Sequence, residues 1–181
     1  NSSPAVYAGV ISGTGGSLDK IGSGTLTLSG ANTYTGLTTV SVGAVDVQSN
    51  AALGTSAGAT TVASGAAVFI DGSGLAIAEP FSIDGTGIIL GGALRNLANS
   101  NSLTGGITLT GAARIGSAAG VLTISSNDIT GAAQNLTIGG AGDTTVSSNI
   151  TTTTGTLSKD GAGTLTLSGT NTYSGLTTVS V

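Results

Sequence analysis

The chain has 181 residues, of which 32 are glycine, and it contains no cysteine, histidine, methionine or tryptophan. Hydrophobic residues make up 39% and charged residues only 7%, which excludes the composition of a disordered chain. The formal net charge is −4 with four basic residues, so we expect neither nucleic acid nor an anionic membrane as a partner. The absence of cysteine excludes disulfides and fits a chain that crosses an oxidising periplasm.

Apolar and polar residues alternate over short segments, which is the pattern of a half-buried strand. Between these segments lie glycine, asparagine, serine and aspartate, and no segment shows the apolar spacing of an α-helix. We therefore predict strands, in chain order, at residues 25–29, 88–90, 107–110, 121–124 and 136–138.

A shorter repeat lies within the chain, because residues 38–47 are echoed by residues 60–70, so that Thr38 recurs as Thr60. Short strands that recur after 22 residues, the separation of Thr38 and Thr60, predict an all-β parallel solenoid, in which each rung has about three strands. About eight rungs would form a rod roughly 40 Å long at the usual strand separation. A β-sandwich or closed barrel is the alternative, but the echo without Asn-Gly hairpin turns favours the solenoid. Because the core has only five aromatic residues available, small aliphatic residues must fill it.

A longer repeat relates residues 18–42 to residues 157–181, and the copies differ only at positions 19, 21, 23, 31 and 35 of the first. We interpret residues 1–181 as one fragment of a longer solenoid array, with residues 43–156 as intervening rungs. The rungs are then one another's main partners, and exposed strand edges at the ends predict end-to-end self-association.

Both long copies have the pattern K-x-G-x-G-T-L-x-L-x-G-x-N-x-Y-x-G, which resembles the autotransporter passenger-associated repeat of bacterial type V secretion. The motif residues of the two copies are Gly22, Gly24, Leu26, Leu28, Gly30, Asn32, Tyr34, Gly36, Gly161, Gly163, Leu165, Leu167, Gly169, Asn171, Tyr173 and Gly175. The resemblance implies a right-handed β-helix in an exported protein, at the bacterial cell surface or secreted. It also implies that the repeats aid the folding and secretion of the passenger.

The motif residues have a physical interpretation of their own. We expect Gly22, Gly24 and Gly30 to relieve corners that need positive φ or a close approach of two rungs. Asn32 and Asn171 are expected to hold turns through side-chain bonds to the backbone and to stack with asparagines of neighbouring rungs. The rings of Tyr34 and Tyr173 are expected to cover a rung edge while their hydroxyls reach water.

Catalytic chemistry has few candidates, because triads, cysteine nucleophiles and histidine metal centres are excluded. A carboxylate pair remains, and Asp71 with Asp84 is the best one because both follow isoleucine and begin Asp-Gly-x-Gly. The formation of tight turns also explains the Asp-Gly-x-Gly pattern. Gly139–Asp143 resembles a calcium-binding nonapeptide but lacks one residue before the aspartate, so we do not expect it to bind calcium. We expect no enzyme activity, no cofactor and no metal.

The hypothesis from the sequence is a rigid stalk whose parent protein adheres to a host or bacterial cell-surface ligand. A polysaccharide-degrading β-helix is one alternative. Threonine rows, at Thr25 and Thr27, Thr108 and Thr110, and residues 151–154, suggest an ice-binding solenoid as the other. Threonine also simply suits exposed strand positions.

Overall fold

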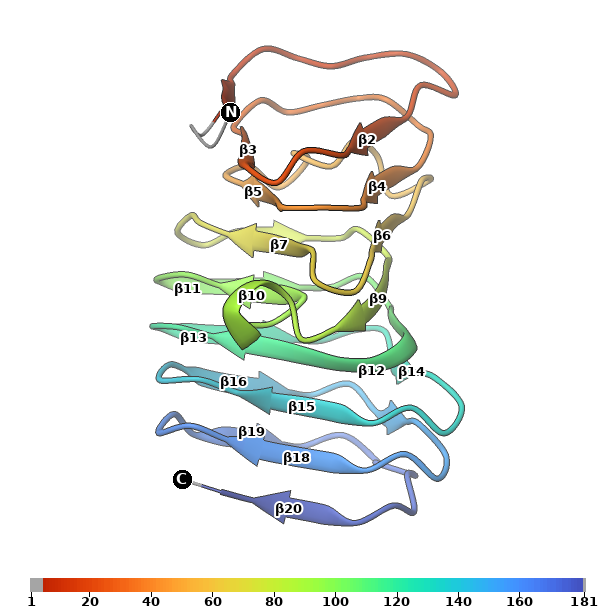
Figure 1. Ribbon diagram of the computed structural model, residues 1–181, viewed down its shortest axis with the longest axis vertical. Helices are drawn as coiled ribbons and strands as arrows, with labels where there is room; N and C mark the ends of the chain where they lie inside the picture. Colours follow the sequence, from red (N-terminus) through yellow and green to blue (C-terminus); the bar gives the residue numbers. More distant parts are fainter. Residues whose placement is uncertain (1–4, 181) are drawn as a thin grey trace.

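The alternating segments form short strands that pair in parallel with the equivalent strands one rung before and one rung after. The computed structural model describes residues 5–180, and over these residues the chain winds as a parallel β-solenoid (Figure 1). Strands on the near side run from right to left as the chain descends, so the winding is right-handed (Figure 1). The predicted fold class is confirmed, whereas Val181, the last residue of the long repeat, lies outside the described residues.

Each full rung has three strands, one on each of three faces, which the chain visits in the order A, B, C. Face A contains β2 (Leu18–Lys20), β4 (Thr38–Val40), β6 (Thr60–Val62), β9 (Phe81–Gly85), the first part of β12 (Ile107–Ser117), β14 (Ile129–Thr130) and β17 (Ile150–Thr151). Face B contains β1 (Ala5–Tyr7), β3 (Thr25–Leu28), β5 (Ala44–Val47), β7 (Ala67–Ile70), β10 (Leu94–Asn96), the last part of β12, β15 (Leu136–Gly139), β18 (Leu157–Asp160) and β20 (Thr177–Val179). Face C contains β8 (Ala76–Ile77), β11 (Ser100–Leu103), β13 (Val121–Ile124), β16 (Asp143–Val146) and β19 (Leu165–Leu167).

The register along face B defines the rungs. The aligned inward residues are Ala5, Leu26, Val45, Val68, Leu94, Ile115, Ile138, Lys159 and Val179. The length of a rung varies along this series, from the shortest interval, Leu26 to Val45, to the longest, Val68 to Leu94. On face A, Thr38 aligns with Thr60, so the echo seen in the sequence marks one rung.

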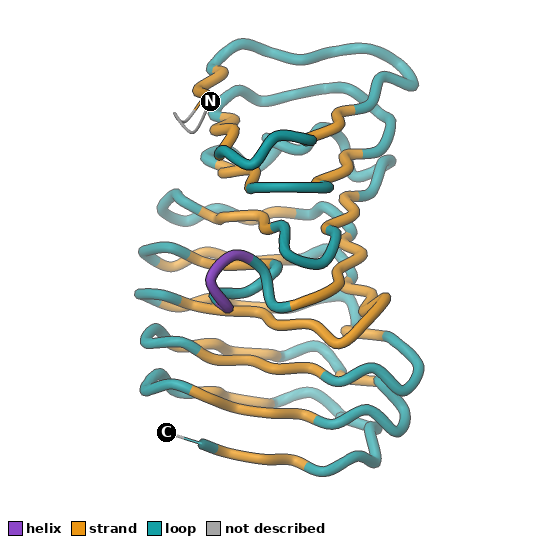
Figure 2. The backbone as a smooth tube through the Cα atoms, viewed as in Figure 1, coloured by secondary structure: helices purple, strands orange, loops and turns teal. Residues whose placement is uncertain are grey.

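The faces differ in regularity along the solenoid. Strands on face C begin only at β8, and the earlier rungs cross that face as loops (Figure 2). Faces A and B are joined by β12, whose register shifts between Leu109 and Ala113 where it bends from one face to the other. Such a bulge lets one continuous strand turn a corner.

The core is a narrow column of aliphatic side chains between the three faces. Its fully buried members include Leu28, Val45, Val68, Leu94, Ile115, Leu122, Ile138 and Ile150. Successive strands present these residues inward and polar residues outward, so each rung covers the apolar surface of the next. Phe81 and Tyr34 are the largest buried side chains, which agrees with a core that needs few aromatic residues.

The strand predicted at residues 88–90 is wrong. These residues form the 3-10 helix η1 (Ile88–Leu90) in a loop that Figure 2 shows projecting from the solenoid. Ile89 is 91% exposed, and its φ of 52° lies in the left-handed region that β-branched residues avoid. The physical reason is the length of the rung from Val68 to Leu94, which is the longest on face B. Its additional residues do not fit into the stacked strands and form an outward loop. No helix within residues 5–180 is long and apolar enough to span a membrane.

Candidate functional site: the repeat motif

The motif lysines occupy inward positions that other rungs fill with aliphatic residues. Lys20 aligns with Val40 on face A, and Lys159 aligns with Ile138 on face B. Both side chains are at least nine-tenths buried, and each ammonium group donates a hydrogen bond to the carbonyl two residues later, that of Gly22 or Gly161. The stem of each lysine therefore packs as a core residue while its amine binds corner carbonyls.

The motif asparagines bridge neighbouring rungs. The Oδ1 of Asn32 accepts a hydrogen bond from the backbone N–H of Ile11 at 2.8 Å, and Asn171 accepts one from Ile150 at 2.9 Å. In both copies the donor lies 21 residues earlier. The Nδ2 of Asn32 also donates to the carbonyl of Ala52 on the following rung. Asn32 thus joins three successive rungs, and its hydrogen bonds go to backbone groups of those rungs rather than to neighbouring asparagines.

The expectation that the tyrosine hydroxyls reach water is wrong for Tyr34. Tyr34 is 1% exposed, and its hydroxyl hydrogen-bonds Thr38 Oγ1 at 2.5 Å. A Cβ at Gly54, on the following rung, would lie 2.9 Å from the Tyr34 ring, so glycine there allows the two rungs to close over it. Burial raises the pKa of the Tyr34 hydroxyl. Tyr173 makes the equivalent bond to Thr177 at 2.8 Å but stays partly exposed.

The motif glycines divide into two groups. Side chains at Gly30 and Gly169 would overlap carbonyl oxygens of the preceding rung, those of Gly9 and Ser148, which confirms the expected close approach of rungs. Gly36, Gly163 and Gly175 meet carbonyls of the preceding rung in the same way. Gly22 needs neither positive φ nor space, so that expectation is wrong.

The two copies of the motif lie on different faces of the solenoid. The first places its lysine on face A and its Thr-Leu-Thr-Leu strand on face B. The second places the same residues on faces B and C, so the copies are separated by six rungs and one face. The lysine and tyrosine bonds within the motif persist in both copies, and each asparagine still binds the rung before it, so these contacts do not require a particular face.

Comparison with known proteins identifies these segments. Residues 18–47 and 157–180 match the family model described as Passenger-associated-transport-repeat. Two segments of the chain match the passenger-associated-transport-repeat, and we call them the transport repeats. They cover less than a third of its length, and the residues between them share the fold without matching that model. No curated protein and no solved structure matches the chain.

The lysine of each transport repeat is expected to act mainly through its stem. Burial lowers the pKa of Lys20, so the charged form gains nothing from its inward position. We expect Lys20→Ala to lower the free energy of unfolding by about 2 kcal/mol, because it removes buried methylene groups. Lys20→Met keeps the stem and should cost less than half as much. Urea unfolding followed by circular dichroism measures both, and equal losses would assign the effect to the ammonium bonds instead.

A hollow of about 450 Å³ lies beside the first transport repeat, where face C gains its first strand. It is lined by Asn32, Thr33, Asn50, Ala51, Leu53, Gly54, Thr55, Ser56, Ala76, Ala78 and Glu79. Glu79 is 5% exposed, and its Oε1 accepts a hydrogen bond from Thr60 at 2.9 Å. Burial raises the pKa of Glu79 to about 7. Glu79 is the only glutamate of the chain, and the carboxylate pair favoured from the sequence, Asp71 with Asp84, did not include it.

The predicted carboxylate pair is not brought together. Asp71 follows β7 on face B, whereas Asp84 lies in β9 on face A. The acidic neighbour of Asp71 is Asp46, which is 8% exposed, and Gln48 Nε2 bonds both carboxylates at 3.2 and 3.5 Å. Burial, with the nearby charge of Asp71, raises the pKa of Asp46. Within residues 5–180, no three acidic side chains gather where they could hold a metal ion.

Proposed function

We propose that the chain is a rigid structural segment of an exported bacterial autotransporter passenger, which ends at the cell surface or is secreted. The transport repeats would nucleate rungs, so that the passenger folds progressively as it emerges. The observation that carries the proposal is that the two repeats make equivalent bonds, through the asparagine Oδ1 and the tyrosine hydroxyl, on different faces. A motif that makes the same lysine and tyrosine bonds within its own residues at two places suits a chain that emerges segment by segment. The parent protein would use this stalk to present an adhesive region to a host or bacterial cell.

Removal of single rungs tests the folding role. Residues 27–45 form one rung of the first transport repeat, because Leu26 aligns with Val45. Residues 116–138 form one rung outside the repeats, because Ile115 aligns with Ile138. Each deletion therefore preserves the register of the remaining strands.

The chain and both deletion variants would be placed between a signal peptide and the outer-membrane barrel of a bacterial autotransporter. Antibody labelling of intact cells measures the displayed amount. We expect the loss of residues 27–45 to reduce display more than the loss of residues 116–138. Equal reductions would contradict a special role for the transport repeats.

End-to-end association is proposed for the isolated 181-residue chain. At the C-terminal end, Leu157, Leu165, Leu167 and Val179 line a hollow of about 280 Å³, and Val6 at the other end is 69% exposed. Unpaired strand edges with apolar neighbours favour pairing with another chain. Light scattering should show a mean mass that rises with concentration, and a constant monomer mass would contradict the proposal.

The alternative functions draw less support. A polysaccharide-cleaving site needs paired carboxylates, and only Glu79 provides one in the 450 Å³ hollow. An ice-binding surface needs a two-dimensional array, but the aligned outward threonines of face A, Thr39, Thr61, Thr108, Thr130 and Thr151, form one line with Ser82. Thr27 and Thr152, expected in outward rows, are buried. A measurement of thermal hysteresis on the purified chain tests the ice-binding alternative, and a positive result would support it.

A further inference from the structure

A third hollow, of about 210 Å³, lies on the outer surface of face B. Its origin is the outward stack in which Arg95 aligns with Gly116, Gly116 with Gly139, and Gly139 with Asp160. Two successive glycines leave a gap between the arginine and the aspartate. Side chains at these positions would overlap the carbonyl of Gly91 and the carboxylate of Asp160, so the gap depends on both glycines.

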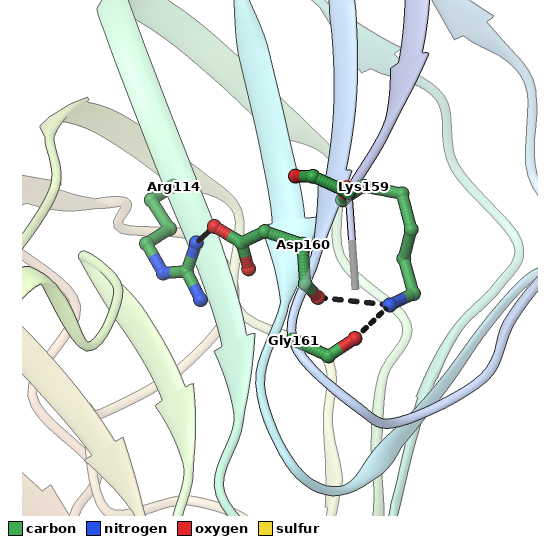
Figure 3. Close-up of polar contacts among 5 residues, drawn as sticks. Arg114, Lys159, Asp160 and Gly161 are labelled. Carbon is green, nitrogen blue, oxygen red and sulfur yellow. Dashed lines mark hydrogen bonds and ion pairs between the residues drawn. The ribbon is translucent and has the colours of Figure 1, made fainter.

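Arg114 lies on the same outward side of β12, two residues before Gly116. It extends across the gap, and its Nη1 forms an ion pair with Asp160 Oδ2, as Figure 3 shows. The Arg114 side chain is only 12% exposed, and its Nε is buried without a partner among the described residues. Asp160 Oδ1 is likewise buried without a partner among those residues, so an unpaired donor and an unpaired acceptor remain at this ion pair.

Arg95 lines the same hollow, together with Arg114, Ser117 and the backbone of Gly140 and Ala141. Within residues 5–180, Arg95 forms no ion pair. Half of the four basic residues of an acidic chain therefore share one small hollow. Both guanidinium groups line the hollow, whereas the carboxylate of Asp160 pairs with Arg114 and does not line it, so the hollow has positive charge and free donors.

We propose that this hollow binds a carboxylate group through Arg95 and Arg114. A guanidinium group presents parallel N–H donors that match the two oxygens of a carboxylate. The volume suits one acidic group rather than a whole oligosaccharide, so the ligand is either a small carboxylic acid or the acidic group of a larger molecule. The proposal does not depend on the role of the transport repeats.

The composition of the chain makes a direct test available. Arg95 and Arg114 are its only arginines, so a proton–nitrogen NMR spectrum contains two Nε–Hε signals. We expect sodium acetate at neutral pH to shift both signals saturably, with one common dissociation constant. Sodium chloride at the same ionic strength should not do so. A parallel titration with glucuronate distinguishes the sources: equal affinity indicates a bare carboxylate site, and tighter binding indicates contacts to the attached sugar.

Two variants separate binding from general charge effects. Arg95→Gln should weaken acetate binding, measured at the Arg114 signal, by about fivefold or more, because it removes a charge-assisted hydrogen bond. Asp19→Asn changes the net charge far from the hollow, on β2, and should leave the affinity unchanged. Unsaturable shifts, identical shifts in chloride, or unchanged affinity in Arg95→Gln would overturn the proposal. Arg95 makes no ion pair among the described residues, so its replacement leaves the Arg114–Asp160 pair intact.

Discussion

Replacing Tyr34 with alanine is expected to lower the free energy of unfolding by about 3–5 kcal/mol, the usual cost of removing a buried aromatic ring. The ring is 1% exposed and is enclosed between its own rung and Gly54 of the next. Tyr34→Phe removes only the hydroxyl bonded to Thr38, and should cost about 1 kcal/mol. Urea unfolding followed by far-ultraviolet circular dichroism measures both changes.

The second transport repeat supplies a matched control. Tyr173 has the same hydroxyl bond to a threonine four residues later, and among its immediate neighbours only Ser174 differs, in place of Thr35. No further rung covers Tyr173 among the described residues. Tyr173→Ala should therefore cost much less than Tyr34→Ala. Equal losses for the two variants would mean that enclosure between rungs does not set the stability of the motif.

The stability of the chain is expected to fall as pH rises from about 4.5 to about 7, through Glu79. Its folded-state pKa is raised to about 7 by burial, above an ordinary value of 4.5. In this window the folded state keeps a proton that the unfolded state has released, so the free energy of unfolding decreases with pH. The full effect is about 3 kcal/mol, present below pH 4.5 and lost above pH 7.

The comparison of the wild-type chain with Glu79→Gln isolates this contribution. Glutamine keeps the hydrogen-bonding shape of the protonated acid without a titration, so the variant should lose the decline between pH 4.5 and 7. Asp46, whose pKa is also raised by burial, contributes a decline of the same sign in both proteins. Urea unfolding at several pH values measures the difference. Parallel curves for the two proteins would contradict a buried, proton-binding Glu79.

Local patterns in the sequence predicted much of the fold. The echo of Thr38 in Thr60 identified rung neighbours directly, because parallel stacking aligns equivalent residues of successive rungs. The strand predicted at residues 88–90 is wrong, because a short apolar run between glycines is compatible both with a strand and with an outward loop. Only the surplus length of the rung between Val68 and Leu94 decides between them, and that length is known only once the register is known.

The less predictable features depend on the same variation in rung length. Lys20 lies on face A and Lys159 on face B because the rungs between them differ in length. The number of residues between the two copies therefore does not by itself show that they lie on different faces. The hollow between Arg95 and Arg114 requires knowing that Gly116, Gly139 and Asp160 align in one outward stack. The burial of Tyr34 depends on Gly54, which lies outside the first transport repeat, residues 18–47, so the motif itself does not reveal it.

Cross-linking of aligned strands tests the stacked solenoid most directly, because the chain contains no cysteine of its own. Thr39 and Thr61 are outward neighbours on β4 and β6, where strands lie about 4.8 Å apart. The variant with Thr39→Cys and Thr61→Cys should form an intramolecular disulfide rapidly on mild oxidation. Combining Thr39→Cys with Ala63→Cys places the sulfur-bearing residues about 8 Å apart, beyond disulfide reach, and should form little. Equal cross-linking in both variants, or preferential cross-linking of the second, would contradict the register and the solenoid built on it.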